Sequence, residues 1–162
     1  MAAGIAQLPL REFEFHGYTG KRRVISFGWK YEFEGERLEE AETIPALLLP
    51  LRDRAARFAG IEPEALAHVL VTEYAAGAAI GWHRDKAVFG DVVGISLLAP
   101  CVFRLRQKSG AGWNRYSLTV EPRSAYLLRG AARSQWEHSI RAPGALRYSV
   151  TFRSLATRMG KR

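Results

Sequence analysis

The chain has little cysteine and no long apolar run. Its one cysteine, Cys101, excludes an internal disulfide and a cysteine-based zinc site. No apolar stretch approaches the roughly 18 residues that a membrane-spanning helix needs. The N-terminal stretch MAAGIAQLPLREFEF lacks the charged start and the long apolar run of a secretory signal. We therefore expect a cytoplasmic protein with no membrane partner.

Acidic residues are also few relative to basic ones. The 162 residues include 16 Asp and Glu against 24 Lys and Arg, which gives a formal net charge of +8. The basic residues cluster at GKRR (20–23), FRLRQK (103–108) and RMGKR (158–162). Any one cluster is compatible with a solvated surface, but the excess as a whole favours a polyanionic partner, nucleic acid first. With 48% apolar residues the chain can bury a substantial core.

The length fits a single domain covering residues 1–162. In the first third, REFEFHGY and KRRVISFGWKYEF alternate as strands do. The stretch IPALLLPLRDRAARF (44–58) predicts an amphipathic helix that starts after Thr43 and is kinked at Pro50. Its apolar stripe is formed by Leu47, Leu48, Leu51, Ala55 and Phe58. IEPEALAHV (61–69) predicts a second, short helix.

From residue 69 to residue 155 the pattern changes to short strands separated by Gly and Pro. The predicted strands are VLVTEY, AIGWH, DVVGISLL, CVFRLRQ, RYSLTV, SAYLL, WEHSI and LRYSVTFRSL. Two helices followed by many short strands predict an α+β fold, with the helices packed outside a β-sandwich or barrel. Such an architecture can hold a ligand between its two sheets.

The stretch GWHRDK (81–86) contains a candidate metal site. In an extended segment His83 and Asp85 point to the same side, so both can face one metal ion. His138, in the strand-like WEHSI, is the candidate third ligand, whereas His68 lies in the predicted second helix and is expected to be a packed or surface residue. Two histidines and one carboxylate form the ligand set of non-haem Fe(II) oxygenases, and they can also hold catalytic zinc.

The last predicted strand, LRYSVTFRSL (146–155), carries arginines on one face. With a period of two, Arg147 and Arg153 share a polar face with Ser149 and Thr151, and Tyr148, Val150 and Phe152 share the other face. Two arginines directed into a pocket require anionic partners, and a dicarboxylic keto acid is one such partner. On a solvent face the same arginines would only pair with surface carboxylates.

Together these motifs resemble the AlkB-like Fe(II)- and 2-oxoglutarate-dependent dioxygenases. The resemblance lies in the H-x-D at 83–85 within YAAGAAIGWHRD, the histidine at 138 and the R-x5-R of RYSVTFR at 147–153. It extends over residues 70–162 and, more loosely, over residues 12–60. It implies a double-stranded β-helix, or jelly roll, with helices on the outer side and a core at 69–155.

The resemblance also implies a role for each matched residue. Iron would be held by His83, Asp85 and His138, and the keto acid would fill two of the remaining positions. The family positions for 2-oxoglutarate are occupied here by Thr72, Tyr74, Arg147, Ser149 and Arg153. Thr72 and Ser149 stand where the best-known members have asparagine, so they offer a hydroxyl of shorter reach.

The implied activity is oxidative demethylation of N-alkylated bases in DNA or RNA, which is alkylation damage repair, with release of succinate, CO2 and formaldehyde. The base would be single-stranded or flipped out of a duplex. Residues 1–45 resemble the family's nucleotide-recognition region, and the substrate contacts expected there and on a later strand are Arg22, Arg23, Trp29, Tyr31 and Arg104. Two alternatives remain, an oxygenase of the same fold acting on a protein or small molecule and a non-catalytic nucleic-acid-binding module. We expect a monomer.

Overall fold

The structure is a computed structural model that describes residues 1–15, 18–32 and 37–156. The last residue of the predicted strand KRRVISFGWKYEF, part of REFEFHGY and the basic segment at 158–162 lie outside the described residues. So does the side chain of Tyr31, whose backbone is described. Within this part of the chain no helix is long and apolar enough to cross a membrane.

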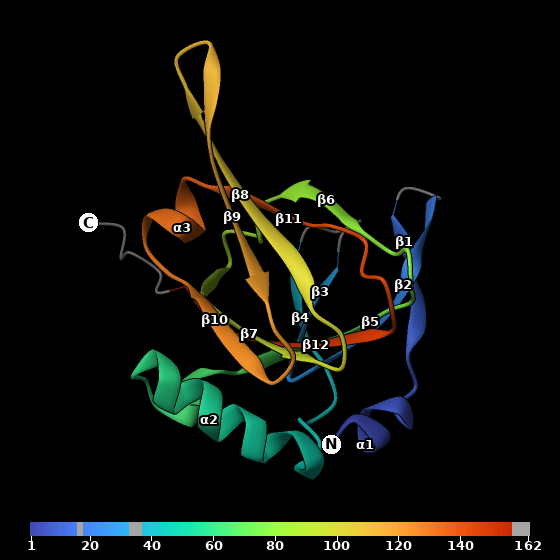
Figure 1. Ribbon diagram of the computed structural model, residues 1–162. Coiled ribbons are helices and arrows are strands. Elements are labelled where there is room, and N and C mark those ends of the chain that lie inside the picture. The colour runs from blue at the N-terminus through green and yellow to red at the C-terminus, as the bar shows by residue number, and fades with distance from the viewer. Residues whose placement is uncertain (16–17, 33–36, 157–162) are drawn as a thin grey trace, which may run out of the picture.

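Two antiparallel sheets face each other (Figure 1). The major sheet has the strand order β1-β2-β5-β12-β7-β10 and the minor sheet has the order β6-β11-β8-β9. The major strands are β1 (Arg11–Phe15), β2 (Tyr18–Phe27), β5 (His68–Tyr74), β12 (Arg147–Leu155), β7 (Phe89–Leu97) and β10 (Ser124–Leu128). The minor strands are β6 (Ile80–His83), β11 (Glu137–Ile140), β8 (Cys101–Ser109) and β9 (Gly112–Val120). This is the predicted jelly roll.

The alternating residues of β12 explain how the two sheets pack. Val150 and Phe152 are fully buried in a core cluster on the outer face of the major sheet, which also contains Leu51 and Ala55 of the long helix. The polar residues of β12 lie on the opposite face, toward the minor sheet. We call this the inner face. A second apolar cluster, which includes Phe103 and Ile140, fills part of the space between the sheets.

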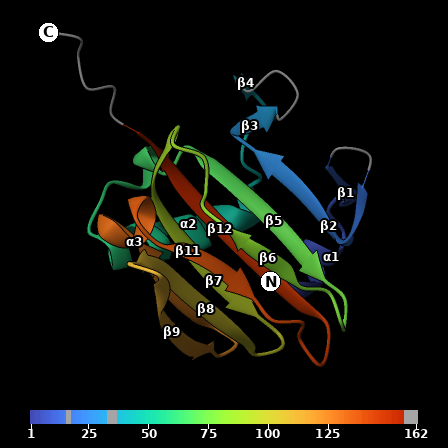
Figure 2. The same cartoon turned by 90° about the horizontal axis from the view of Figure 1, so that it is seen from above.

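Helices cover the outer face of the major sheet, as Figures 1 and 2 show. They are α1 (Ala2–Ala6) and α2 (Leu49–Ala59), and α2 is preceded by a 3-10 turn at Ala46–Leu48. Pro50 lies in the first turn of α2, where its missing N–H costs nothing, so the predicted kink is wrong. Thr43 is not the helix cap, because the 3-10 turn is capped at Pro45.

Two other details of the helix prediction are wrong. Phe58 is 54% exposed, because the buried stripe of α2 is formed by Leu51, Ala55, Ala56 and Ala59. The predicted second helix is only a 3-10 turn at Pro63–Ala65, and His68 instead begins β5. The turn ends at Ala65 and β5 begins at His68, so too few residues remain between them for further helical turns. A further short helix, α3 (Ala131–Ser134), precedes β11.

The N-terminal region forms two separate parts. Strands β1 and β2 extend the major sheet, while β3 (Trp29–Glu32) and β4 (Arg37–Glu40) form a hairpin of their own. Gly28 separates them with φ = 78°, and a Cβ there would collide with the carbonyl oxygen of Ala67. Only glycine fits this turn, which directs β3 away from the major sheet.

Candidate active site

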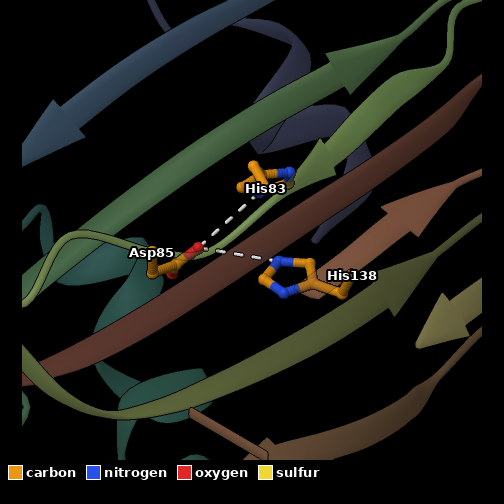
Figure 3. Close-up of side chains that lie close together, drawn as sticks. All are labelled: His83, Asp85 and His138. Carbon is orange, nitrogen blue, oxygen red and sulfur yellow. Dashed lines mark ion pairs between the residues drawn. The ribbon is translucent and has the colours of Figure 1, made fainter. Parts of the chain in front are cut away.

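His83, Asp85 and His138 converge between the two sheets (Figure 3). His83 ends β6 and is paired in register with His138 of the adjacent strand β11, while Asp85 follows two residues after β6. Asp85 Oδ1 lies 3.7 Å from His83 Nε2 and 3.6 Å from His138 Nε2. One ligand atom of each residue lies within 4.8 Å of the others, so the three side chains could hold one metal ion. This donor set suits Fe(II).

Arg153 of β12 fixes the orientation of Asp85. Its Nε donates to Asp85 Oδ2 at 2.6 Å, which leaves Oδ1 directed at the two histidines. Burial raises the pKa of the Asp85 carboxyl, but the charge and hydrogen bond of Arg153 and the charges of both histidines outweigh burial and lower it below its usual range. The carboxylate is therefore ionised and ready to bind a cation.

Each histidine presents a ring nitrogen to the metal position. Burial, followed by the neighbouring His83, lowers the pKa of His138 to about 4, although Asp85 opposes this shift. His83 Nδ1 lies 2.8 Å from the carbonyl oxygen of Gly81. With Nδ1–H donating to that carbonyl, the Nε2 lone pair faces the metal position.

Arg147 places a second cation on the inner face of β12. The residue has no exposed surface, and its Nε donates to Ser96 Oγ of β7 at 2.9 Å. Its Nη1 and Nη2 are buried and have no hydrogen-bond partner among the described residues. Its guanidinium carbon also lies 5.1 Å from the centroid of the Tyr74 ring. Buried N–H groups without a hydrogen-bond partner are costly, so Nη1 and Nη2 fit a bound carboxylate such as the far end of a keto acid.

The remaining residues predicted for the keto acid line the same inner face. Tyr74 pairs in register with Arg147, and Thr72 pairs with Ser149. Burial raises the pKa of the Tyr74 hydroxyl above its usual value, so it stays a neutral hydrogen-bond donor. Ser149 and Thr72 are buried, and Ser149 Oγ lies 3.2 Å from Thr151 Oγ1. The structure thus brings together all five predicted positions and the metal group.

Sequence reasoning missed Ser96 and Tyr126 at this site. Tyr126 of β10 pairs in register with Gly94, and a Cβ on Gly94 would overlap the Tyr126 ring. The glycine lets the Tyr126 ring lie across the inner face of β7. Burial there raises the pKa of the Tyr126 hydroxyl, and the charge of Arg147 opposes this shift. A glycine inside the strand DVVGISLL was the available signal for such a close approach.

His68 lies beside the metal group rather than in it. It is 2% exposed, its ring centroid is 4.7 Å from that of Phe89, and its Nδ1 is 3.5 Å from Arg153 Nη1. Burial and the charge of Arg153 lower the pKa of His68 to about 3, against a raising effect of Asp85. His68 was expected to be a packed or a surface residue, and the structure shows the packed alternative, on a strand and not on a helix.

Arg133 of α3 holds the loop that carries Asp85. Its guanidinium donates to the carbonyl oxygens of Gly90 at 2.7 Å and Phe89 at 2.6 Å, with longer bonds to Lys86 at 3.1 Å and Asp85 at 3.4 Å. A cavity of about 490 Å³ lies beside this loop, with Asp85 and Arg133 among the residues that line it. Sequence reasoning missed this role as well, because an arginine that binds backbone carbonyls leaves no residue pattern.

The five predicted substrate residues do not converge. Arg22 of β2 pairs with Tyr74, which directs it to the inner face, whereas Arg23 points to the outer face and forms a bidentate ion pair with Glu73 at 2.7 and 2.8 Å. Trp29 is half-buried in the β3–β4 hairpin, and the backbone of Tyr31 lies in the same strand. Arg104 pairs with Ser139, beside His138, and therefore lies on the opposite face of the minor sheet from the metal group.

The comparisons with known proteins agree with this geometry. A family model of the 2OG-Fe(II) oxygenase superfamily matches residues 11–153. The chain belongs to this superfamily. Its relatives identify it as an AlkB-like oxygenase, and the superfamily uses Fe(II) and 2-oxoglutarate, which the metal group and Arg147 fit.

Two relatives support the AlkB-like assignment, and one solved structure supports the fold. The alkylated DNA repair protein ALKBH8 homolog of Arabidopsis thaliana is 26% identical, over 74% of this chain and 42% of that protein. The mitochondrial alpha-ketoglutarate-dependent dioxygenase alkB homolog 7 of Mus musculus is 35% identical, over 67% of this chain and 54% of that protein. The chain thus spans about half the length of the curated relatives it matches. The solved structure of OsALKBH1 has the same fold, with a TM-score of 0.65, 14% identity and coverage of 83% of this chain and 78% of that one.

Proposed function

We propose that this AlkB-like oxygenase oxidatively demethylates N-alkylated bases in DNA or RNA. The observation that carries the proposal is Arg147, a fully buried cation whose two Nη groups have no hydrogen-bond partner among the described residues. It lies on β12, the strand whose Arg153 bonds the metal-group residue Asp85. When bound, Fe(II) and 2-oxoglutarate supply the oxidising power from dioxygen, and the products are succinate, CO2 and formaldehyde.

The residues of the chain have distinct tasks in this proposal. His83, Asp85 and His138 hold the metal, and Arg153 keeps Asp85 Oδ2 occupied so that Oδ1 remains the ligand atom. The guanidinium of Arg147 binds the far carboxylate of 2-oxoglutarate, with the Tyr74 hydroxyl as a neutral donor beside it. Thr72 and Ser149 line the same pocket.

The substrate part of the proposal rests on charge and on the names of relatives. The net charge of +8 suits a polyanion, and the Arabidopsis relative is named an alkylated DNA repair protein. Arg22, which shares the inner face with Tyr74, is the predicted residue best located to contact a substrate phosphate or base. A cytoplasmic location stays a prediction, since the alkB homolog 7 relatives are named mitochondrial. A monomeric state stays one as well.

The test is product formation with a methylated substrate. Purified protein is mixed anaerobically with Fe(II) and 2-oxoglutarate, oxygen is admitted, and succinate and formaldehyde are measured. Oligonucleotides carrying methyl-adenine or methyl-cytosine are compared with the same sequences without the methyl groups.

Formaldehyde that appears only with the methylated oligonucleotide would support the demethylase. Succinate without formaldehyde would reject the nucleic-acid substrate and retain the oxygenase, whose substrate would then be a protein or a small molecule. Neither product, from folded protein that has bound metal, would reject turnover and favour a nucleic-acid-binding module.

A further inference from the structure

A ladder of aromatic and basic side chains covers the outer face of the minor sheet. The guanidinium carbon of Arg106 lies 4.4 Å from the ring centroid of Trp82 and 4.2 Å from that of Trp113, between the two rings. Arg104 stacks on Trp82 at 5.0 Å, and Lys108 Nζ lies 5.1 Å from the Trp113 ring. Such cation–π contacts stabilise long side chains in fixed positions.

This surface is separate from the candidate active site. Arg104 pairs with Ser139 and Arg106 pairs with Glu137, the residues on either side of His138. Because neighbouring residues of a strand point to opposite faces, the ladder and the metal ligand His138 lie on opposite faces of the minor sheet. Arg115 pairs with Arg106 and so belongs to the ladder face too. We call Trp82, Arg104, Arg106, Lys108, Trp113 and Arg115 the hairpin surface.

The hairpin surface is strongly basic. The four strands of the minor sheet carry four cationic residues, all on this surface, and Glu137 is their one carboxylate. Glu137 accepts a bond from Arg106 Nε at 3.2 Å. The Nε of Arg104 donates to Ser139 Oγ at 3.0 Å, and Lys108 and Arg115 are exposed. The surface therefore retains a clear positive excess after its internal pairings are counted.

The stacked arrangement also selects the kind of anion. When rings cover the faces of a guanidinium, its N–H edges remain directed outward, and such edges match phosphate oxygens. Trp113 is 37% exposed, so part of its ring is available for stacking. Edges that bind phosphate next to a ring that can stack on a base are the features of a single-stranded nucleic-acid surface. An acidic peptide would use the charges but not the ring.

We propose that the hairpin surface binds a single-stranded segment of nucleic acid outside the active site. Strands β8 and β9 extend as a hairpin beyond the body of the molecule, on the side away from α2 (Figure 1). Lys108, Trp113 and Arg115 of the hairpin surface are exposed, and Trp82, Arg104 and Arg106 are partly exposed. The proposal rests on the proposed function only in taking the substrate strand to be nucleic acid.

The other face of the same hairpin presents an aromatic side chain, Tyr116, on the side of the active site. Tyr116 of β9 pairs with Leu105, which pairs with His138, so Tyr116 lies on the face of the sheet that holds the metal ligands. It is 61% exposed and two strands away from His138, a distance of about 10 Å across the sheet. A nucleic-acid strand that passes around the edge formed by β9 would move from the hairpin surface to the face that carries Tyr116 and His138.

The test uses a fluorescent single-stranded oligonucleotide without modification, with binding followed by anisotropy over a series of salt concentrations. The variant Lys108→Glu with Arg115→Glu should bind at least about 10-fold more weakly. The slope of its log affinity against log salt concentration should become shallower by about 0.7 for each phosphate that the variant no longer neutralises. Trp113→Ala should bind about 10-fold more weakly with an unchanged salt dependence, because it removes stacking and no charge.

The matched control is Arg54→Glu with Arg57→Glu. It makes the same change of charge at exposed positions of α2, on the opposite side of the molecule, and should bind nearly as the unchanged protein does. Thermal melting of all variants checks that they are folded. Equal weakening by the control and hairpin variants would overturn the proposal, as would normal binding by the hairpin variants or no binding by the unchanged protein.

Formaldehyde release from a methylated oligonucleotide separates this inference from the proposed function. Formaldehyde from the unchanged protein together with normal binding by the hairpin variants would overturn the hairpin surface alone. Binding that depends on the hairpin surface, with no formaldehyde from any methylated oligonucleotide, would support the surface and reject the demethylase.

Discussion

Arg147 should favour the binding of 2-oxoglutarate but lower the free energy of unfolding of the metal-free protein. Its Nη groups are buried without a hydrogen-bond partner in the described part of the chain, and a buried polar group left in this way costs about 1–3 kcal/mol. Arg147→Met should therefore raise the free energy of unfolding of the metal-free protein by about 1–3 kcal/mol. The same variant should need roughly 100-fold more 2-oxoglutarate for succinate formation, because the far carboxylate loses a buried cation.

Denaturant unfolding and the dependence of succinate formation on 2-oxoglutarate check this prediction. Arg104→Met is the control, since Arg104 lies on the opposite face of the minor sheet from the metal group. A variant at position 147 that unfolds more easily and keeps the normal 2-oxoglutarate requirement would remove Arg147 from the keto-acid site.

The buried His68 should make the free energy of unfolding of the metal-free protein fall as the pH is lowered. Its pKa is about 3 in the folded chain against an ordinary value of 6.5, so the unfolded chain binds more protons between these values. Its contribution to stability is complete above pH 6.5 and is lost as the pH falls, by about 3 kcal/mol between pH 7 and pH 4. His68→Asn retains an acceptor for Arg153 and cannot titrate, so it should lose that much less stability over the same range.

Unfolding free energies measured at several pH values compare the two proteins. A parallel pH dependence of the unchanged protein and of His68→Asn would mean that His68 is not held neutral by burial.

At the scale of elements, the loop after β6 depends on α3. Arg133 of α3 donates hydrogen bonds to carbonyl oxygens of this loop. In return, Arg84 Nη1 of the loop donates to the carbonyl oxygen of Ser134 in α3 at 2.9 Å. Arg133→Ala should weaken metal binding about 10-fold, as the loss of outer partners of metal ligands does, because Asp85 is held less firmly.

Titration calorimetry with Mn(II) measures this effect. Arg129→Ala is the control, because Arg129 lies near α3 but bonds Asp91 and the carbonyl oxygen of Ala59 instead of the loop residues next to Asp85. Equal metal affinity of Arg133→Ala and the unchanged protein, with both folded, would show that α3 does not position the metal site.

Strands were predicted from the sequence more accurately than helices. The alternation in LRYSVTFRSL predicted β12 within one residue and assigned its two faces correctly, because burial on one side imposes a period of two. The helix at 44–58 was predicted, but its start, the effect of Pro50 and the burial of Phe58 depend on how α2 meets the sheet. Local sequence does not encode that packing.

At the scale of the whole molecule, the candidate site could be predicted where motifs carry it. His83, Asp85 and His138 meet as expected, Arg153 bonds Asp85, and Arg147 lies on the same face of β12 as Arg153. Ser96, Tyr126 and Arg133 join the site only through strand register and loop packing, which involve residues distant in sequence. The predicted substrate residues were the least successful, because Arg22 and Arg23 lie on opposite faces of the major sheet and Arg104 lies on the face of the minor sheet away from the metal group.

The central claim is that the space between the sheets holds the metal and the keto acid side by side. Its most direct test is an anaerobic titration of 2-oxoglutarate into the Fe(II)-loaded protein, followed by the visible charge-transfer absorption of Fe(II) chelated by a keto acid. We expect a saturable band for the unchanged protein and none for Asp85→Ala, which lacks the carboxylate between the two histidines. No band from the unchanged protein, or an equal band from folded Asp85→Ala, would contradict the account.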